Sequence, residues 1–294
     1  MRLGAFELNE PVPELSKTYA LAMLRPWIDF GSVGTLTLSW LETNLRAKQL
    51  ARLARPGNFY DFTRYRPVLY RREGQRHVEI PNSYVTYGSK MAGNDFLFLH
   101  LLEPHMLGEV YVDSVLRLLT RFSVERYYLL GSVYDFVPHT RPLLVTGGAF
   151  GETAERDFKS AGIVPSDYEG PTTITYLISQ RVCEMGIESM SLTVHLPQYT
   201  QLDEDYMGVV RLMEILSSLH GVPVDEANVE KAEQQREQIT AEVEKNRQVK
   251  AIVEQLENHY DARVVESKEE EKSPRLSPEV ERFLREMERR FGQG

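Results

Sequence analysis

Residues 95–102, DFLFLHLL, are apolar at nearly every position and constrain the fold more than any other stretch. A strand that alternates apolar and polar residues needs only one covered face, whereas a continuous apolar run must be covered on both faces. The stretch 18–25, TYALAMLR, has the same character. Two such strands in one chain predict a sheet with helices on both sides, which is typical of α/β proteins.

The patterns around these two strands agree with that architecture. Residues 66–81 alternate apolar and polar positions around Glu73-Gly74, which predicts a β-hairpin. An antiparallel hairpin among parallel strands predicts a mixed, mostly parallel sheet. The periodicity also predicts strands over 126–133 and 189–196, and helices over 31–45, 108–122, 170–185 and 204–220, the last closed by Gly221.

Composition narrows the function classes. The chain has 294 residues, 42% of them hydrophobic, so it can bury a large core, and its formal net charge is −9. A net negative charge argues against general binding to nucleic acid, which needs basic patches, and against docking on an anionic membrane. The only cysteine, Cys183, allows no disulfide within the chain, and neither a signal peptide nor an apolar run long enough to span a bilayer is visible. We expect a cytoplasmic protein that binds neither nucleic acid nor membrane.

The composition changes near residue 224, which we take as the end of an α/β core domain over 1–224. Residues 225–262 form a predicted helical extension, rich in Glu, Gln, Lys and Ala. Five residues spaced seven apart form a narrow seam along its length. One interpretation is a helix packed on its own domain; the other is an arm that pairs with another subunit, with the seam asparagine setting the register. The seam residues are Ala232, Ile239, Asn246, Val253 and Tyr260.

A charged segment over 263–276 is predicted to be a flexible linker to a last amphipathic helix over 277–294. Ser277-Pro278 supplies an N-cap and a proline at the first helical position. One helical face carries the apolar side chains, and it could dock on its own domain or in a groove on a partner. The residues on this face are Val280, Phe283, Leu284, Met287 and Phe291.

Polar residues gather after several predicted strands, where ligands bind in open α/β sheets. The residues 133–148, VYDFVPHTRPLLVTGG, are the densest such stretch. A binding crevice there and at the neighbouring strand ends would use an imidazole as general acid or base and a guanidinium to hold an anion. The candidate crevice residues are Asp29, Glu103, His105, His139, Arg141, Thr146, Tyr168 and Glu169.

A purely structural interpretation of the same residues is available. The prolines of VPHTRP (137–142) set a non-helical crossover, Arg141 can tie loop groups together, and Thr146-Gly147-Gly148 is expected to be a turn that needs glycine. The Gly-x-x-Gly of residues 31–34 lacks a dinucleotide fingerprint and a Walker lysine. No local histidine pair indicates a metal, and no Gly-x-Ser-x-Gly elbow marks a nucleophile. We therefore assign no catalytic residue, no metal and no cofactor.

Taken in order, these motifs resemble the second-subunit type of proteasome assembly chaperone, in its bacterial and archaeal branch. The resemblance covers about residues 15–260 and departs from the family pattern in the turn over 27–34. The label ATP-grasp that some family members carry has no support here, because a phosphate-binding glycine loop with its lysine is missing. The motifs that carry the resemblance are Glu103-Pro104-His105, Val137–Pro142, Val145-Thr146-Gly147, Pro165–Thr172 and Leu196–Tyr199.

The resemblance implies a three-layer α/β/α sandwich similar to nucleoside phosphorylases, with added C-terminal helices. It also implies a homo-oligomer, which we expect to be a trimer, and a role in guiding proteasome subunits together. Docking chaperones often end in a hydrophobic residue, tyrosine and any residue, whereas this chain ends Phe291-Gly292-Gln293-Gly294.

Two functions remain open at this point. The first is a non-enzymatic, homo-oligomeric scaffold or assembly chaperone that binds other proteins, one of them through its C-terminal helix. The second is an enzyme or sensor of the nucleoside phosphorylase type, in which Glu103, His105, His139 and Arg141 converge on a nucleotide or another anion.

Overall fold

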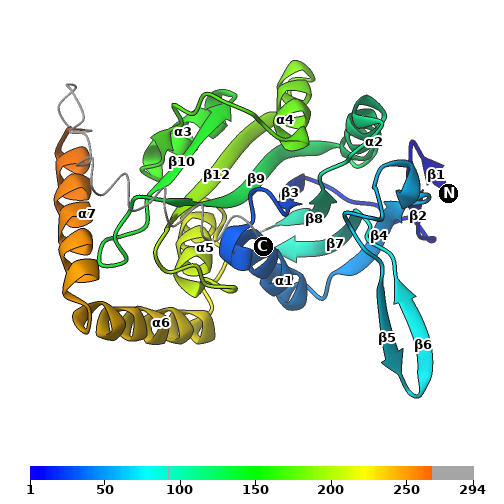
Figure 1. Cartoon of the computed structure of the whole chain (residues 1–294). Coiled ribbons are helices and arrows are strands. Elements are labelled where there is room, and N and C mark those ends of the chain that lie inside the picture. The colour runs from blue at the N-terminus through cyan, green and yellow to red at the C-terminus, as the bar shows by residue number, and fades with distance from the viewer. Residues whose placement is uncertain (92, 267–294) are drawn as a thin grey trace.

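The computed structural model describes residues 1–91 and 93–266, in which ten strands form one sheet in the order β1-β2-β4-β7-β8-β3-β9-β12-β10-β11 (Figure 1). These strands are β1 (Arg2–Leu3), β2 (Phe6–Leu8), β3 (Thr18–Arg25), β4 (Lys48–Leu53), β7 (Tyr84–Met91), β8 (Asn94–Leu102), β9 (Val124–Asp135), β10 (Val145–Phe150), β11 (Val164–Pro165) and β12 (Glu188–Pro197). The two strands that the sequence marks as apolar, β3 and β8, are neighbours at the centre of the sheet.

The sheet is mixed, as expected. Parallel pairing joins β8, β3, β9 and β12 in the centre and β10 to β11 at one edge. Five of the nine neighbouring pairs in the described residues are antiparallel, namely β1-β2, β2-β4, β4-β7, β7-β8 and β10-β12. A mostly parallel sheet is therefore not confirmed, because the outer strands pair mainly in the antiparallel sense.

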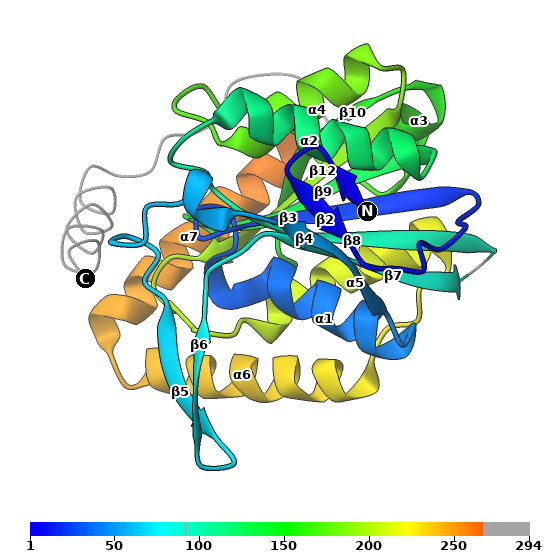
Figure 2. The ribbon, with the colours of Figure 1, turned by 90° about the vertical axis from the view of Figure 1, so that its right-hand side faces the viewer.

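The predicted hairpin is present as β5 (Val68–Arg72) and β6 (Gln75–Glu79), with its turn at Glu73 and Gly74. Gly74 has a φ of 79°, which glycine adopts without steric cost. The inference that this hairpin makes the main sheet mixed was wrong, because it forms a separate two-stranded sheet. Figures 1 and 2 show it projecting from the body of the molecule.

Helices cover both faces of the sheet (Figure 2). Alternate residues of β3 enter two different cores: Ala20, Ala22 and Leu24 pack with α2 and α4, whereas Leu21 and Met23 pack with α1 and α5. This division explains why the strand is apolar throughout. The helices are α1 (Val33–Asn44), α2 (Gly108–Arg121), α3 (Glu152–Ser160), α4 (Ile174–Glu184), α5 (Tyr206–His220), α6 (Glu226–Glu244) and α7 (Arg247–Glu266), with short 3₁₀ turns at Phe30–Ser32 and Pro56–Asn58.

The C-terminal extension is two helices with a break near Asn246. The Asn246 side chain accepts hydrogen bonds from the N–H groups of Gln248 (3.0 Å) and Val249 (3.3 Å), and so caps α7. Ala232 and Val253 are buried against the rest of the chain. The seam therefore packs on its own domain, in agreement with the first of the two interpretations.

The remaining calls on the C-terminal part divide at residue 266. The start of the predicted linker, 263–266, lies within α7. Its remainder, 267–276, and the predicted helix over 277–294 lie outside the described residues.

Candidate functional site

The crossover over 137–142 is held by contacts to segments far away in the chain. His139 is 1% exposed, and its Nδ1 lies 2.6 Å from the Tyr199 hydroxyl, which also accepts from the His139 N–H. Nε2 lies 3.1 Å from the Thr240 hydroxyl in α6. Burial lowers the pKa of His139, so the ring is neutral near pH 7. Both ring nitrogens already have a partner within the chain.

Arg141 binds α7. Its Nε and Nη2 donate to the two carboxylate oxygens of Asp261 at 2.9 and 2.7 Å, and Nη1 lies 3.3 Å from Glu257. Such a forked pair uses the planar geometry of the guanidinium. The ion pair with Arg141 lowers the pKa of Asp261. The anion that holds this arginine is thus a carboxylate of the chain itself, 120 residues further on.

Thr146 belongs to a hydrogen-bonded chain across three strands. Its hydroxyl lies 2.7 Å from Nε2 of His195, and Nδ1 of the same ring lies 2.7 Å from the Asp135 carboxylate. The order of groups matches a hydrolase triad. However, the Asp135 side chain is 30% exposed and that of His195 14%, whereas Thr146 is only 7% exposed. A nucleophile must be the accessible member of such a triad, and here it is the least accessible one. The hydrogen-bonded series Thr146–His195–Asp135 therefore joins the strands β10, β12 and β9.

The expected turn at Thr146-Gly147-Gly148 is wrong, because these residues form the middle of β10. A Cβ on Gly147 would fall on the carbonyl of Ser191 in β12. Glycine is needed there for close approach of two strands and not for a turn.

Glu103 and His105 lie at the end of β8, as predicted, but each has a local partner. The Glu103 carboxylate accepts from the N–H of Ile174 at 2.9 Å and so caps α4. Burial raises its pKa, and the Ile174 N–H partly offsets this. His105 Nδ1 accepts from the N–H of Asp61 at 3.2 Å, and its ring lies 4.7 Å from that of Tyr65.

A pocket of about 810 Å³ opens beside these two residues. Two members of the predicted crevice, Glu103 and His105, therefore line the same cavity. Its other lining residues are Trp27, Gly57, Tyr60, Asp61, Phe62, Arg64, Pro104 and Met106.

The Asp29 carboxylate stabilises the turn before α1. Its carboxylate accepts from the N–H and the hydroxyl of Thr35, at 3.0 and 2.5 Å. Burial raises the pKa of Asp29, and the Thr35 hydrogen bonds partly offset this. Because a carboxylate of the chain occupies the helix N-terminus, a phosphate would meet a like charge there.

Tyr168 and Glu169 lie on an exposed loop between β11 and α4. Tyr168 is 68% exposed, and its hydroxyl donates to the carbonyl of Pro171 at 2.9 Å. The structure therefore distributes the eight candidate residues over several places. Glu103 and His105 share a pocket, whereas His139 and Arg141 bind the C-terminal helices. Thr146 is hydrogen-bonded to His195, which in turn contacts Asp135.

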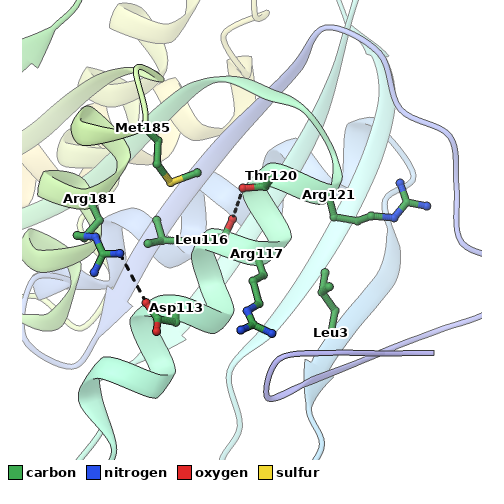
Figure 3. A pocket seen from close by; sticks show the side chains of 8 residues that line it. All are labelled: Leu3, Asp113, Leu116, Arg117, Thr120, Arg121, Arg181 and Met185. Atoms are coloured by element: carbon green, nitrogen blue, oxygen red, sulfur yellow. Dashed lines mark hydrogen bonds and ion pairs between the residues drawn. The ribbon is translucent and has the colours of Figure 1, made fainter.

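Sequence reasoning did not single out a groove between α2 and α4 (Figure 3). Leu3, Leu116 and Met185 supply apolar surface, and Arg117, Arg121 and Arg181 surround it, in a groove of about 560 Å³ that also contains Asp113 and Thr120. Helical periodicity could show that Arg117 and Arg121 share a face of α2. Nothing in the sequence shows that Arg181 and Leu3 lie beside them.

Two further features concern the described residues alone. Within 1–91 and 93–266, no group of three or more His, Cys, Asp or Glu side chains is arranged to hold a metal ion. None of the helices in those ranges combines the length and apolar character needed to cross a bilayer.

Known structures share this fold. A Mycobacterium tuberculosis protein of unknown function, Rv2714, is 26% identical with a TM-score of 0.79, over 98% of this chain and 97% of that one. The M. tuberculosis proteasome-assembly chaperone homologue Rv2125 is 21% identical with a TM-score of 0.71, over 80% and 99%. Pyrococcus furiosus PbaB, an archaeal proteasome activator, is 17% identical with a TM-score of 0.63, over 83% and 100%.

No curated protein matches the chain. The model of the PAC2 family matches residues 23–245, which is well over half of the sequence. The chain therefore belongs to the PAC2 family.

Proposed function

We propose that this protein is a non-enzymatic, homo-oligomeric scaffold of the assembly-chaperone type, which binds other proteins through its projecting hairpin. The relatives named as a proteasome-assembly chaperone homologue and a proteasome activator support this role and make ring subunits of a proteasome-like particle candidate partners. The proposal includes the three-layer α/β/α label and the trimer that the family resemblance implies.

The hairpin β5–β6 is the observation that carries the proposal. All ten of its strand residues are exposed. An isolated two-stranded hairpin is marginally stable in water, so its persistence on a surface suggests a contact with another molecule. Its large apolar side chains are 42–61% exposed, and they are Val68, Leu69, Tyr70, Val78 and Ile80.

One face of the hairpin is suited to a partner with an apolar centre and carboxylates around it. Leu69 lies opposite Val78, and next along the same face Arg71 lies opposite Arg76. Like charges directly opposite each other destabilise a strand pair. Acidic groups on a partner would relieve that repulsion while Leu69 and Val78 become buried.

The hairpin offers a matched pair of variants to test this. Val78→Ser changes the proposed contact face, whereas Val68→Ser makes the same change on the other face at nearly equal exposure, 61% against 58%. We expect cross-linked complexes isolated from the native host to contain a protein partner with the wild-type chain and with Val68→Ser, but not with Val78→Ser. The purified chain should then raise the yield of the partner's assembled form.

Recovery of the chain alone, at low and at high salt, would contradict the protein-binding role. Equal recovery of a partner by both valine variants would show that this face of the hairpin is not the binding surface. Sedimentation velocity of the purified chain tests the homo-oligomer separately.

The pocket beside Glu103 and His105 favours a second candidate, a small-molecule sensor or enzyme. Ligand binding raises thermal stability by mass action, so a panel of nucleotides and phosphate tests it directly. A stabilisation that Glu103→Gln abolishes would favour this candidate.

A further inference from the structure

We propose that the α2/α4 groove is the docking site for the C-terminal segment, residues 277–294, of a second copy of this chain. The inference rests on the self-association proposed above and names the surfaces that produce it.

The groove is longer than its central cavity. On α2, Val110 lies three residues before Asp113 and seven before Arg117, so all three share a helical face. On α4, Leu177 and Met185 lie four residues either side of Arg181. Val110, Leu177 and Met185 are 48%, 46% and 43% exposed. Apolar side chains therefore continue at both ends of the arginine cluster.

The arginines of the groove have spare capacity for carboxylates. Arg181 lies 3.8 Å from Asp113 and 3.3 Å from Glu184, and all three side chains are at least half exposed. Figure 3 shows Arg117 and Arg121 extending from α2 on either side of Leu3. No ion pair of Arg117 or Arg121 is formed within the part of the chain that the structure describes. The groove thus carries three cations, and Asp113 and Glu184 both lie beside Arg181.

The C-terminal segment has the complementary pattern. Its apolar face includes Val280 and Met287, and the sequence reads Glu279-Val280-Glu281 and Glu286-Met287-Glu288. In a helix, sequence neighbours lie about 100° to either side, so glutamates border the apolar face on both sides. Of the four arginines in the segment, Arg282, Arg285 and Arg289 fall on the opposite face, whereas Arg290 borders the apolar face. An apolar stripe between carboxylates fits an apolar floor between arginines.

The lengths also agree. Val280 and Phe291 are eleven residues apart, and so are Val110 and Arg121, which corresponds to about 16 Å of helix in each case. Laying an amphipathic helix into a groove of this kind is a recurrent mode of recognition.

The self-association proposed above favours a second copy over the same copy. Figure 1 shows α7 and β1 at opposite ends of the molecule. Leu3 of β1 lines the groove, whereas α7 is bound through Arg141 to the loop before β10. β1 and β10 are eight positions apart in the sheet, or about 38 Å. The α4 side of the groove lies nearer to β10, because α4 packs on β9 and β12, so the choice of a second copy rests on the proposed self-association.

The first experiment measures docking with the full-length chain. A fluorescent peptide of residues 275–294 is titrated with a chain whose own segment carries Phe283→Asp and Met287→Asp, which leaves the groove free. We expect saturable binding that Arg117→Glu with Arg181→Glu weakens by about tenfold or more. Arg156→Glu, the same change on the exposed surface of α3, should alter the affinity by less than about twofold.

A charge swap distinguishes loss of the proposed contact from misfolding of the groove variant. A peptide carrying Glu281→Arg and Glu288→Arg should bind the double Arg→Glu chain more tightly than the unchanged peptide does. Absence of peptide binding to the free groove, or equal weakening by Arg156→Glu, overturns the proposal.

The second experiment separates a second copy from the same copy. In a Cys183→Ala background, a chain with Thr120→Cys is mixed with a differently tagged chain carrying Glu288→Cys and then oxidised. We expect a disulfide between the two tagged chains. A chain that carries both cysteines and forms only an internal disulfide would overturn the second-copy assignment.

Sedimentation velocity distinguishes this failure from failure of the proposed function. If the wild-type chain self-associates and Phe283→Asp with Met287→Asp does so equally, the groove proposal fails while the homo-oligomer stands. If the wild-type chain is monomeric at all concentrations, the homo-oligomer fails and the second-copy proposal fails with it.

Discussion

At Gly147 the strands β10 and β12 approach so closely that a single added carbon decides whether they can pair. A Cβ there would overlap the Ser191 carbonyl, and a backbone atom cannot move without breaking the ladder. A Cβ on the next residue, Gly148, would meet the Ser191 hydroxyl at 3.9 Å, which is ordinary contact. Gly147 therefore has no room for a side chain, whereas Gly148 has room for a methyl group.

We expect Gly147→Ala to lower the free energy of unfolding by about 3 kcal/mol or more, because it forces backbone displacement. Gly148→Ala is its control and should change the stability by about 1 kcal/mol or less. Urea denaturation of both variants measures the difference. Equal stabilities would show that β10 can shift freely against β12.

His220 is a residue whose titration affects the stability of the whole fold. Its Nε2 lies 2.7 Å from the Tyr128 hydroxyl, and burial, with a contribution from Arg126, lowers its pKa to about 4. In the unfolded chain the pKa returns to about 6.5. Between these values the unfolded state binds more protons, so stability falls as the pH drops from 6.5 toward 4.

The shift corresponds to a loss of about 3 kcal/mol across that window. We expect His220→Gln to remove this part of the pH dependence, because glutamine does not titrate. Denaturant unfolding at pH 7, 5.5 and 4.5 compares the two proteins. Parallel pH profiles would mean that His220 binds its proton as readily in the folded state as in the unfolded one.

At the scale of elements, the break between α6 and α7 shows that a heptad pattern has more than one outcome. Asn246 occupies a seam position, where a buried asparagine in a coiled coil would set register. In the structure it caps α7 instead, and the flanking seam residues pack on the α/β core. Packing on the rest of the same chain buries seam residues such as Ala232 and Val253 without a partner helix.

The cap and the coiled coil predict different effects of substitution at Asn246. For a cap, Asn246→Ala should lower the free energy of unfolding by about 1 kcal/mol, and Asn246→Asp should have little effect. For a buried seam residue, Asn246→Val should stabilise the chain and change its oligomeric state. Thermal unfolding and sedimentation of the three variants decide between the two.

At the scale of the molecule, the hairpin β5–β6 is a separate unit attached to a sheet that does not need it. Its residues are exposed and pair only with each other in the sheet topology. We expect replacement of residues 67–80 by a short glycine linker to change the melting temperature by no more than a few degrees. The same deletion should abolish recovery of a protein partner. A large loss of stability would show that the hairpin supports the core.

The sequence alone determined the central architecture. Continuous apolar runs place β3 and β8 inside the sheet, the helical patterns predict α2 and α5 to within two residues at either end, and Gly221 ends α5 in the left-handed conformation. These features depend on local periodicity and backbone preference, which are written within a single segment. The family resemblance was confirmed for the same reason, since its motifs are short and contiguous.

Only the tertiary structure decided what the polar residues do. The stretch 133–148 reads like an active site, yet Arg141 binds carboxylates more than 100 residues away, and His139 contacts Tyr199 and Thr240. The groove on α2 likewise needs Leu3 and Arg181 from distant segments. Hydrogen bonds and ion pairs act over a few ångströms in space and leave no periodic signal in the chain, so the partner of each polar group is known only once the chain has folded.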